Sequence, residues 1–449
     1  MTTTARPLSE TTANYHGAME EAPQEEKQRD AAMSTETTCS ASRHPSETVS
    51  TSIQSLPNEL LSHILEKLDV QPPSAIALYD EPHFALTRSS ESPLKAASLV
   101  SKRWREASKL VLFRCTQFTV PDPEITESRR TILTEQVKPY LDFITSNALQ
   151  KAVRSFALLV EDREVTNTSE GPRSLNEFAS FWSSIFETVD PVTILIVAAP
   201  QALGALTSCH VYLEDAWTFD CPYHYLLLQR PSDLLNKNQP IGSPQIIPEP
   251  QQVKESLEID VGPIPLDQFH EEEIPRASSS ALFEARPWSK LLLNEGSFIR
   301  AYKTYEFWLR VAPSILSDLV GAGTPNNRAY ISPTIRDFSY VGMFPMLRHF
   351  CVLAENLPRL DRLFVQLVPR NDILQQANKM LQIEPQDLWM ERNASYASLM
   401  REMFNTPPSP NYQHLKSKFT ATVGVEWYGG PSSRGLVSVR RALDLDIAV

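Results

Sequence analysis

The sequence predicts an α+β protein with more than one domain, in which a small all-α helical module precedes a larger, irregular α/β domain. In residues 55–68 and 94–113, apolar residues recur three and four positions apart, which is the spacing of amphipathic helices. From Val153 onward, short apolar strands alternate with helical segments, which implies a parallel sheet. A length of 449 residues fits about two or three such units.

The N-terminal helices are predicted from an apolar stripe and the residues that flank it. The segment SLPNELLSHILEKL places five apolar side chains on one helical face: Leu60, Leu61, Ile64, Leu65 and Leu68. Pro57 sits where a first helical turn tolerates a missing N–H, and Glu59 suits the positive end of the helix dipole. The segment LKAASLVSKRWREASKLVLF repeats the pattern, with Ser101 as its predicted N-cap. Three short helices in about 60 residues are too small a unit to bury all this apolar surface.

One interpretation of this module is a helical hairpin packed on its own domain. The arrangement LPxELLxxIL…LxxASxVSKxWR is more specific, and it resembles the F-box, the module by which substrate receptors dock on the Skp adaptor of cullin-based ubiquitin ligases. The match covers about a seventh of the chain. The resemblance implies that the adaptor contact and its supporting core are formed by Leu56, Pro57, Glu59, Leu60, Ile64, Leu65, Leu99, Val100 and Trp104.

Two features depart from the family pattern. F-boxes usually have a short link between the first two helices, whereas this chain has a Pro- and Ser-rich insert at 71–92, which is predicted to loop out. Ser101 stands where the family often has Cys. Neither change touches the apolar stripe.

Composition limits the function classes. A formal net charge of −12 argues against a general nucleic-acid binder, which would show a basic face. No run approaches the ~20 apolar residues of a membrane span, and the N-terminus lacks an apolar signal core. We therefore expect a cytoplasmic or nuclear protein with no membrane partner. Its five scattered cysteines are interpreted as reduced packing residues: Cys39, Cys115, Cys209, Cys221 and Cys351.

Three regions are expected along the chain. Residues 1–52 are rich in Ser, Thr and Glu and predict a disordered tail, either passive or phosphorylated. Residues 53–118 form the helical module with its insert. Residues 119–449 form the α/β domain, interrupted at 231–287 by a Pro-rich insert with little regular structure, part of which could lie on the domain as an extended strand.

The α/β domain is predicted from a recurring L-x-x-L-x-L shape, which looks like an irregular leucine-rich-repeat array. Strands are predicted around 153–158, 189–194, 223–230, 335–340, 347–352, 360–365 and 419–428, and helices at 129–147 (broken near Pro139), 174–189 and 302–308. Leu291–Leu293 are predicted to be buried. Spacings of 12 or 13 residues are barely enough for parallel crossovers, so antiparallel strands at 335–365 remain an alternative. The stretch LLLNEGS…AY…YE also resembles fungal F-box proteins.

Candidate chemistry is sparse. Cys209-His210 and Cys221-x-x-His224 carry zinc-type ligands, but a strand through His224 would turn neighbouring side chains to opposite faces, so they are better interpreted as packing residues. Gly321-Ala-Gly323 is interpreted as a helix stop. No nucleophile elbow, zinc-protease or P-loop motif occurs, so we expect no catalytic residues, no metal and no cofactor. The aromatic residues at 302–308 are predicted to be core, with a recognition surface as the alternative.

The expected function is that of a substrate-recognition subunit of a Skp–cullin–F-box ubiquitin ligase. The N-terminal module would bind the Skp adaptor and the C-terminal domain an unidentified target protein. The alternatives are an F-box scaffold that acts without target ubiquitination, and an enzyme with its chemistry in residues 130–449.

Overall fold

A computed structural model describes residues 53–69, 71–87, 93–120, 133–161, 175–231, 280–322, 329–368, 373–404 and 410–415. The chain divides into two units, 1–55 and 56–449. The predicted tail, most of the Pro-rich insert and the predicted strand at 419–428 lie outside the described residues. Within the described residues, no helix is long and apolar enough to cross a membrane.

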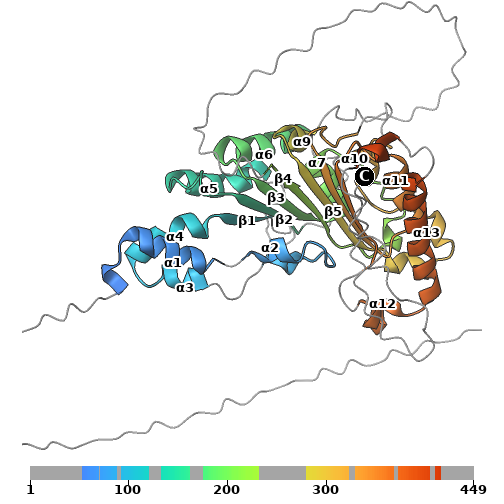
Figure 1. The fold of residues 1–449 in the computed structure, drawn as a ribbon, viewed down its shortest axis with the longest axis horizontal. Coiled ribbons are helices and arrows are strands. Elements are labelled where there is room, and N and C mark those ends of the chain that lie inside the picture. Colours follow the sequence, from blue (N-terminus) through green and yellow to red (C-terminus); the bar gives the residue numbers. More distant parts are fainter. Residues whose placement is uncertain are drawn as a thin grey trace, which may run out of the picture. The chain divides into compact units, whose positions relative to one another are not determined.

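The centre of the second unit is a seven-stranded sheet whose strands follow one another in chain order (Figure 1). The strands are β1 (Cys115–Val120), β2 (Ser155–Val160), β3 (Thr193–Ala198), β4 (His224–Gln229), β5 (Lys290–Ser297), β6 (Asp337–Met343) and β7 (Arg362–Gln366). Strand β4 is antiparallel to both β3 and β5, and every other pair is parallel. The molecule is therefore a mixed α/β protein with a mostly parallel sheet.

Helices between the strands cover one face of this sheet (Figure 1). They are α5 (Leu133–Ser146), α6 (Leu175–Thr188), α7 (Pro200–Thr207), α9 (Ala281–Glu284), α10 (Leu316–Val320) and α11 (Leu347–Glu355), with α13 (Pro385–Phe404) beyond β7. Shorter turns of helix are η3 (Ala216–Thr218), η4 (Ile299–Lys303), η5 (Phe307–Leu309), η6 (Ile373–Gln375), α12 (Ala377–Met380) and η7 (Pro410–His414). The main core forms where alternate strand residues, such as Leu291 and Leu293, meet these helices.

The N-terminal part contains η1 (Ile53–Ser55), α1 (Asn58–Lys67), α2 (Pro73–Ile76), η2 (Phe84–Thr87), α3 (Pro93–Ser98) and α4 (Lys102–Leu112). The prediction that the insert loops out is wrong for residues 77–84. These residues pack on the second face of the sheet, with Leu78 in one apolar cluster with Leu195, Val197 and Tyr225. The cause is that β2 to β5 are apolar on both faces, so the face opposite the helices also needs a cover.

Other predicted elements need correction. The predicted strand at 347–352 is helix α11, because its buried residues, Phe350, Leu353 and Ala354, follow helical spacing. The antiparallel alternative for 335–365 is also wrong, since α11 provides a parallel crossover between β6 and β7. Pro139 lies inside an unbroken α5, which is held by the buried face on either side of it. The predicted aromatic helix at 302–308 is replaced by η4 and η5.

Candidate functional site

The helices α1, α3 and α4 form a small module with its own apolar core. The core residues are Leu61, Leu65, Leu94, Ala97, Trp104 and Val111, with Leu68, Ala107 and Leu112 partly buried against them. Leu61 and Leu65 are one turn apart on α1, and Trp104 and Val111 are two turns apart on α4, so each helix presents one face inward. The module thus has a complete core that uses only part of the apolar stripe.

The rest of the stripe is exposed to solvent. On α1, Leu60 is 50% exposed and Ile64 is 40% exposed. In the turn between α3 and α4, Leu99 is 73% exposed and Val100 is 58% exposed. Single exposed apolar residues are common, but here they come in pairs: Leu60 and Ile64 are one turn apart on α1, and Leu99 and Val100 are consecutive. These two pairs are a candidate binding surface. We call these four residues the exposed apolar set.

Local sequence explains how the set is presented. Pro57 has extended backbone dihedrals, and its carbonyl accepts the first bond of α1 from the Leu61 amide at 3.0 Å. The Ser101 hydroxyl caps α4 by accepting a hydrogen bond from the Trp104 amide at 3.2 Å, as predicted. Arg103 donates to the Asn58 side-chain oxygen at 2.9 Å and to the carbonyl of Leu56. Arg103 therefore links α4 to the start of α1.

Replacing Ser101 by alanine is expected to destabilise the module by about 1 kcal/mol, because the Trp104 amide loses its cap. The measurement is the free energy of unfolding of the full chain in urea, with Ser101→Asn as a variant that keeps a capping oxygen. If Ser101→Ala and Ser101→Asn have the same stability, the cap does not contribute.

The other predicted site residues have different environments. Leu65 and Trp104 are buried in the module core, so of the two predicted roles they fit the supporting one. Pro57 and Glu59 are exposed, and Leu56 is half-buried. Sequence reasoning missed Leu110, which is 62% exposed on α4. The available signal was that Leu110 lies outside the helical spacing that joins Trp104, Ala107 and Val111.

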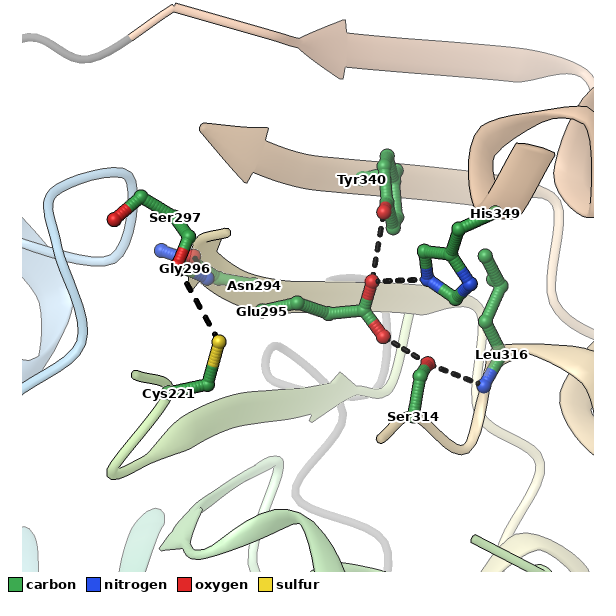
Figure 2. Close-up of polar contacts among 9 residues, drawn as sticks. All are labelled: Cys221, Asn294, Glu295, Gly296, Ser297, Ser314, Leu316, Tyr340 and His349. Carbon is green, nitrogen blue, oxygen red and sulfur yellow. Dashed lines mark hydrogen bonds and ion pairs between the residues drawn. The ribbon is translucent and has the colours of Figure 1, made fainter. Parts of the chain in front are cut away.

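A second candidate is a buried polar cluster at the end of β5 (Figure 2). Glu295 is fully buried, and one carboxylate oxygen accepts a hydrogen bond from the Tyr340 hydroxyl at 2.7 Å and lies 2.8 Å from His349 Nε2. The other oxygen accepts from the Ser314 hydroxyl, which in turn accepts from the Leu316 amide at 2.9 Å. Sequence analysis overlooked this site, although a glutamate two residues after the buried run Leu291–Leu293 was a signal.

The partners of Glu295 explain its ionisation. Burial alone would raise the pKa of Glu295, but the charge of His349 and its hydrogen bond, followed by His224 and Ser314, lower the pKa to about 2. Burial lowers the pKa of His224 to about 4, and neither of its ring nitrogens has a hydrogen-bond partner among the described residues. Both carboxylate oxygens of Glu295 have side-chain partners from other elements of this chain, so the cluster is interpreted as a structural core network.

The four residues considered for zinc have separate environments. The Cys209 thiol donates to the Thr207 carbonyl, and burial raises its pKa to about 12. The Cys221 thiol donates to the Ser297 carbonyl, and the His210 amide donates to Asp318. In the described part of the chain, no three His, Cys, Asp or Glu side chains are grouped so that they could hold a metal ion.

A third candidate lies on two loops beyond the sheet, and its exposed residues are called the aromatic rim: Leu213, Trp217, Tyr305, Trp308, Leu309 and Val311. Asp215 joins the loops by pairing with Arg310 at 3.1 Å and accepting from the Val311 amide at 3.0 Å. Of the predicted aromatic core, Tyr302 is buried but Tyr305 is 84% exposed, so that prediction is only partly confirmed.

In comparisons with known proteins, no family model matches this chain, and no curated protein or solved structure matches it.

Proposed function

We propose that the protein is a substrate-recognition subunit of a Skp–cullin–F-box ubiquitin ligase, with the N-terminal module as an F-box. The observation that carries the proposal is the exposed apolar set. Leu60, Ile64, Leu99 and Val100 occupy F-box motif positions and are left uncovered by a module whose core is already complete. A foreign protein that covered them would remove this apolar surface from water, which is the main favourable term in association.

In this proposal the C-terminal domain binds the target. Its strands follow chain order with helices on one face, an arrangement that supports a leucine-rich-repeat-like domain. The antiparallel strand β4 makes the array irregular. The aromatic rim is the surface best suited to a protein target, because exposed Trp and Tyr side chains are favoured at binding hot spots.

No catalytic step is assigned to this chain. The chemistry belongs to the ligase partners, and the chain raises the effective concentration of target lysines near the charged ubiquitin carrier. The formal net charge of −12 supports a protein target over a nucleic acid. Cytoplasmic or nuclear ligase complexes are the proposed location.

The direct test is co-purification of the full chain with the Skp adaptor, comparing the wild type with variants of the exposed apolar set. The alternative, a scaffold that docks on the adaptor without directing turnover, predicts the same binding. Half-lives of bound partners separate the two, because only a substrate receptor shortens them. Unchanged half-lives after depletion of this chain would favour the scaffold.

Replacing Tyr305 and Trp308 together by alanine is expected to lower target binding about tenfold or more, since each removes a large exposed ring from the aromatic rim. The measurement is quantitative affinity purification of the full chain. Met390→Ala, another exposed apolar residue, is the control, and adaptor binding is expected to stay unchanged in both. If the double variant and the wild type recover every non-adaptor partner equally, the aromatic rim is not the target-binding surface.

A further inference from the structure

The insert between α1 and α3 packs on the second face of the sheet through a short segment, here called the strap (residues 77–84). The strap begins with a turn in which the Asp80 amide donates to the Ala77 carbonyl at 3.2 Å. Buried side chains of the sheet bind its main chain. The Asn294 side-chain amide donates to the carbonyls of Leu78 and Asp80, both at 2.8 Å. Gln366 donates to the carbonyl of Tyr79 at 2.9 Å. Three successive carbonyls of the strap are therefore held by two side chains from separate strands.

The far end of the strap is held in the same way. The Tyr225 hydroxyl accepts a hydrogen bond from the His83 amide at 2.6 Å and donates to the His83 carbonyl at 3.0 Å. The Ser297 hydroxyl donates to Glu81 at 2.8 Å. Apart from the bond to Glu81, these hydrogen bonds are made to the backbone of the strap, so they hold its path more than its side-chain identity.

Two aromatic contacts and one glycine also fit the strap to the second face of the sheet. Tyr79 packs edge-on against Phe364 with ring centroids 5.1 Å apart, and Phe84 packs against Tyr223 at 5.3 Å. Gly296 has a left-handed φ of +69°, and a Cβ on it would lie 3.0 Å from the Pro82 ring. The glycine both permits this backbone conformation and leaves space for the strap.

We propose that the second face of the sheet is a binding site for one short peptide segment, and that the chain fills it with its own residues 77–84 to tie the helical module to the sheet domain. Asn294 is fully buried and Gln366 is 1% exposed, so departure of the strap would leave their amides without these partners. Because the strap is part of the same chain, its effective concentration at the second face of the sheet is high. The state in which the strap is bound to this face therefore dominates.

The consequence rests on the proposed function. In a substrate receptor, the strap limits how far the target-binding domain swings relative to the adaptor-binding helices. Limiting this motion keeps a bound target at a fixed distance from the ligase machinery. A passive surface loop would have no such effect.

Hydrogen exchange on the full chain tests the proposal, with the His83 amide as the reporter. Asn294→Ala removes two bonds to the strap but leaves the bond between His83 and Tyr225 in place. If the strap opens as one unit, His83 is expected to exchange roughly 25-fold faster, at about fivefold for each lost bond. The control is Gln117→Ala, an exposed β1 residue that hydrogen-bonds to Thr119; it is expected to leave the His83 rate unchanged.

Two results would overturn the proposal: wild-type His83 exchanging as fast as a free peptide, or equal rates in Asn294→Ala and Gln117→Ala. If Asn294→Ala unfolds the sheet, Tyr79→Ala weakens the strap from its own side, and the same acceleration is expected. The adaptor is absent from every measurement. Failure of the strap proposal is therefore distinguishable from failure of adaptor docking.

Discussion

Replacing Leu60 and Ile64 together by glutamate is expected to abolish binding of the Skp adaptor, while the chain stays folded. Each side chain is about half exposed, so burying the remainder on docking contributes on the order of 1 kcal/mol. Two glutamates remove that contribution and add the larger penalty of burying unpaired carboxylates. Together these effects predict at least a hundredfold weaker binding, or about 3 kcal/mol. Leu61 and Leu65 keep the module core intact.

The measurement is co-purification of the full chain with the adaptor, followed by titration calorimetry. The matched control is Leu381→Glu with Met390→Glu, which places the same charges at residues that are 62% and 60% exposed in the sheet domain. We expect this control to bind as the wild type does. Wild-type affinity in the Leu60 and Ile64 variant, with the circular dichroism spectrum unchanged, would contradict adaptor docking through this face.

The sequence was a good guide to strands with a continuous apolar run. Leu226–Leu228 lie in β4 as predicted, because a strand covered on both faces needs apolar residues without alternation. Leu291–Leu293, which were predicted only to be buried, are buried in β5. The direction of β4 was not predicted, since apolar content does not depend on strand direction. The 347–352 error has a similar cause: Leu347 and Phe350, the first two positions of the L-x-x-L-x-L shape, are three apart, and a helix produces that spacing too.

For the candidate docking site, the sequence motif identified the apolar stripe. It did not show which residues of the stripe are buried in the module core and which are exposed. Leu60 and Leu61 are adjacent, yet the first is half exposed and the second is 1% exposed, and only packing against α3 and α4 decides which is which. The role of the insert depends on contacts more than 200 residues apart in sequence, such as Asn294 with Leu78, which no local pattern encodes. Because the strap occupies the second face of the sheet, the aromatic rim is left as the better surface for a target.

Acidification is expected to destabilise the fold in two steps, through His224 and then Glu295. The folded pKa of His224 is about 4, below its ordinary 6.5, so between these pH values the unfolded state binds the proton and the folded state does not. The folded pKa of Glu295 is about 2 against an ordinary 4.5, so its carboxylate contributes stability above pH 4.5 that is lost as the pH falls toward 2. Both shifts make the stability fall as the pH falls, by about 3 kcal/mol for each group.

Single substitutions of His224 and Glu295 separate the contributions of these two groups to the pH dependence of stability. Urea unfolding followed by tryptophan fluorescence between pH 7 and pH 4 is expected to show a smaller loss of stability in His224→Phe than in the wild type. Glu295→Gln is expected to destabilise the chain by about 3 kcal/mol or more at pH 7, because one carboxylate oxygen facing Tyr340 and His349 becomes an amide donor. The control, Glu355→Gln, changes an exposed carboxylate on α11 and should be nearly neutral.

The two variants are informative together because His224 and Glu295 interact across neighbouring strands. Removing the carboxylate takes away the charge that favours protonated His224, whereas burial continues to disfavour it. In Glu295→Gln, the loss of stability between pH 6.5 and pH 4 is therefore expected to be at least as large as in the wild type. Its free energy of unfolding at pH 7 is expected to be lower from the start. If Glu295→Gln has the same free energy of unfolding at pH 7 as the wild type, Glu295 is not the ionised centre of this network.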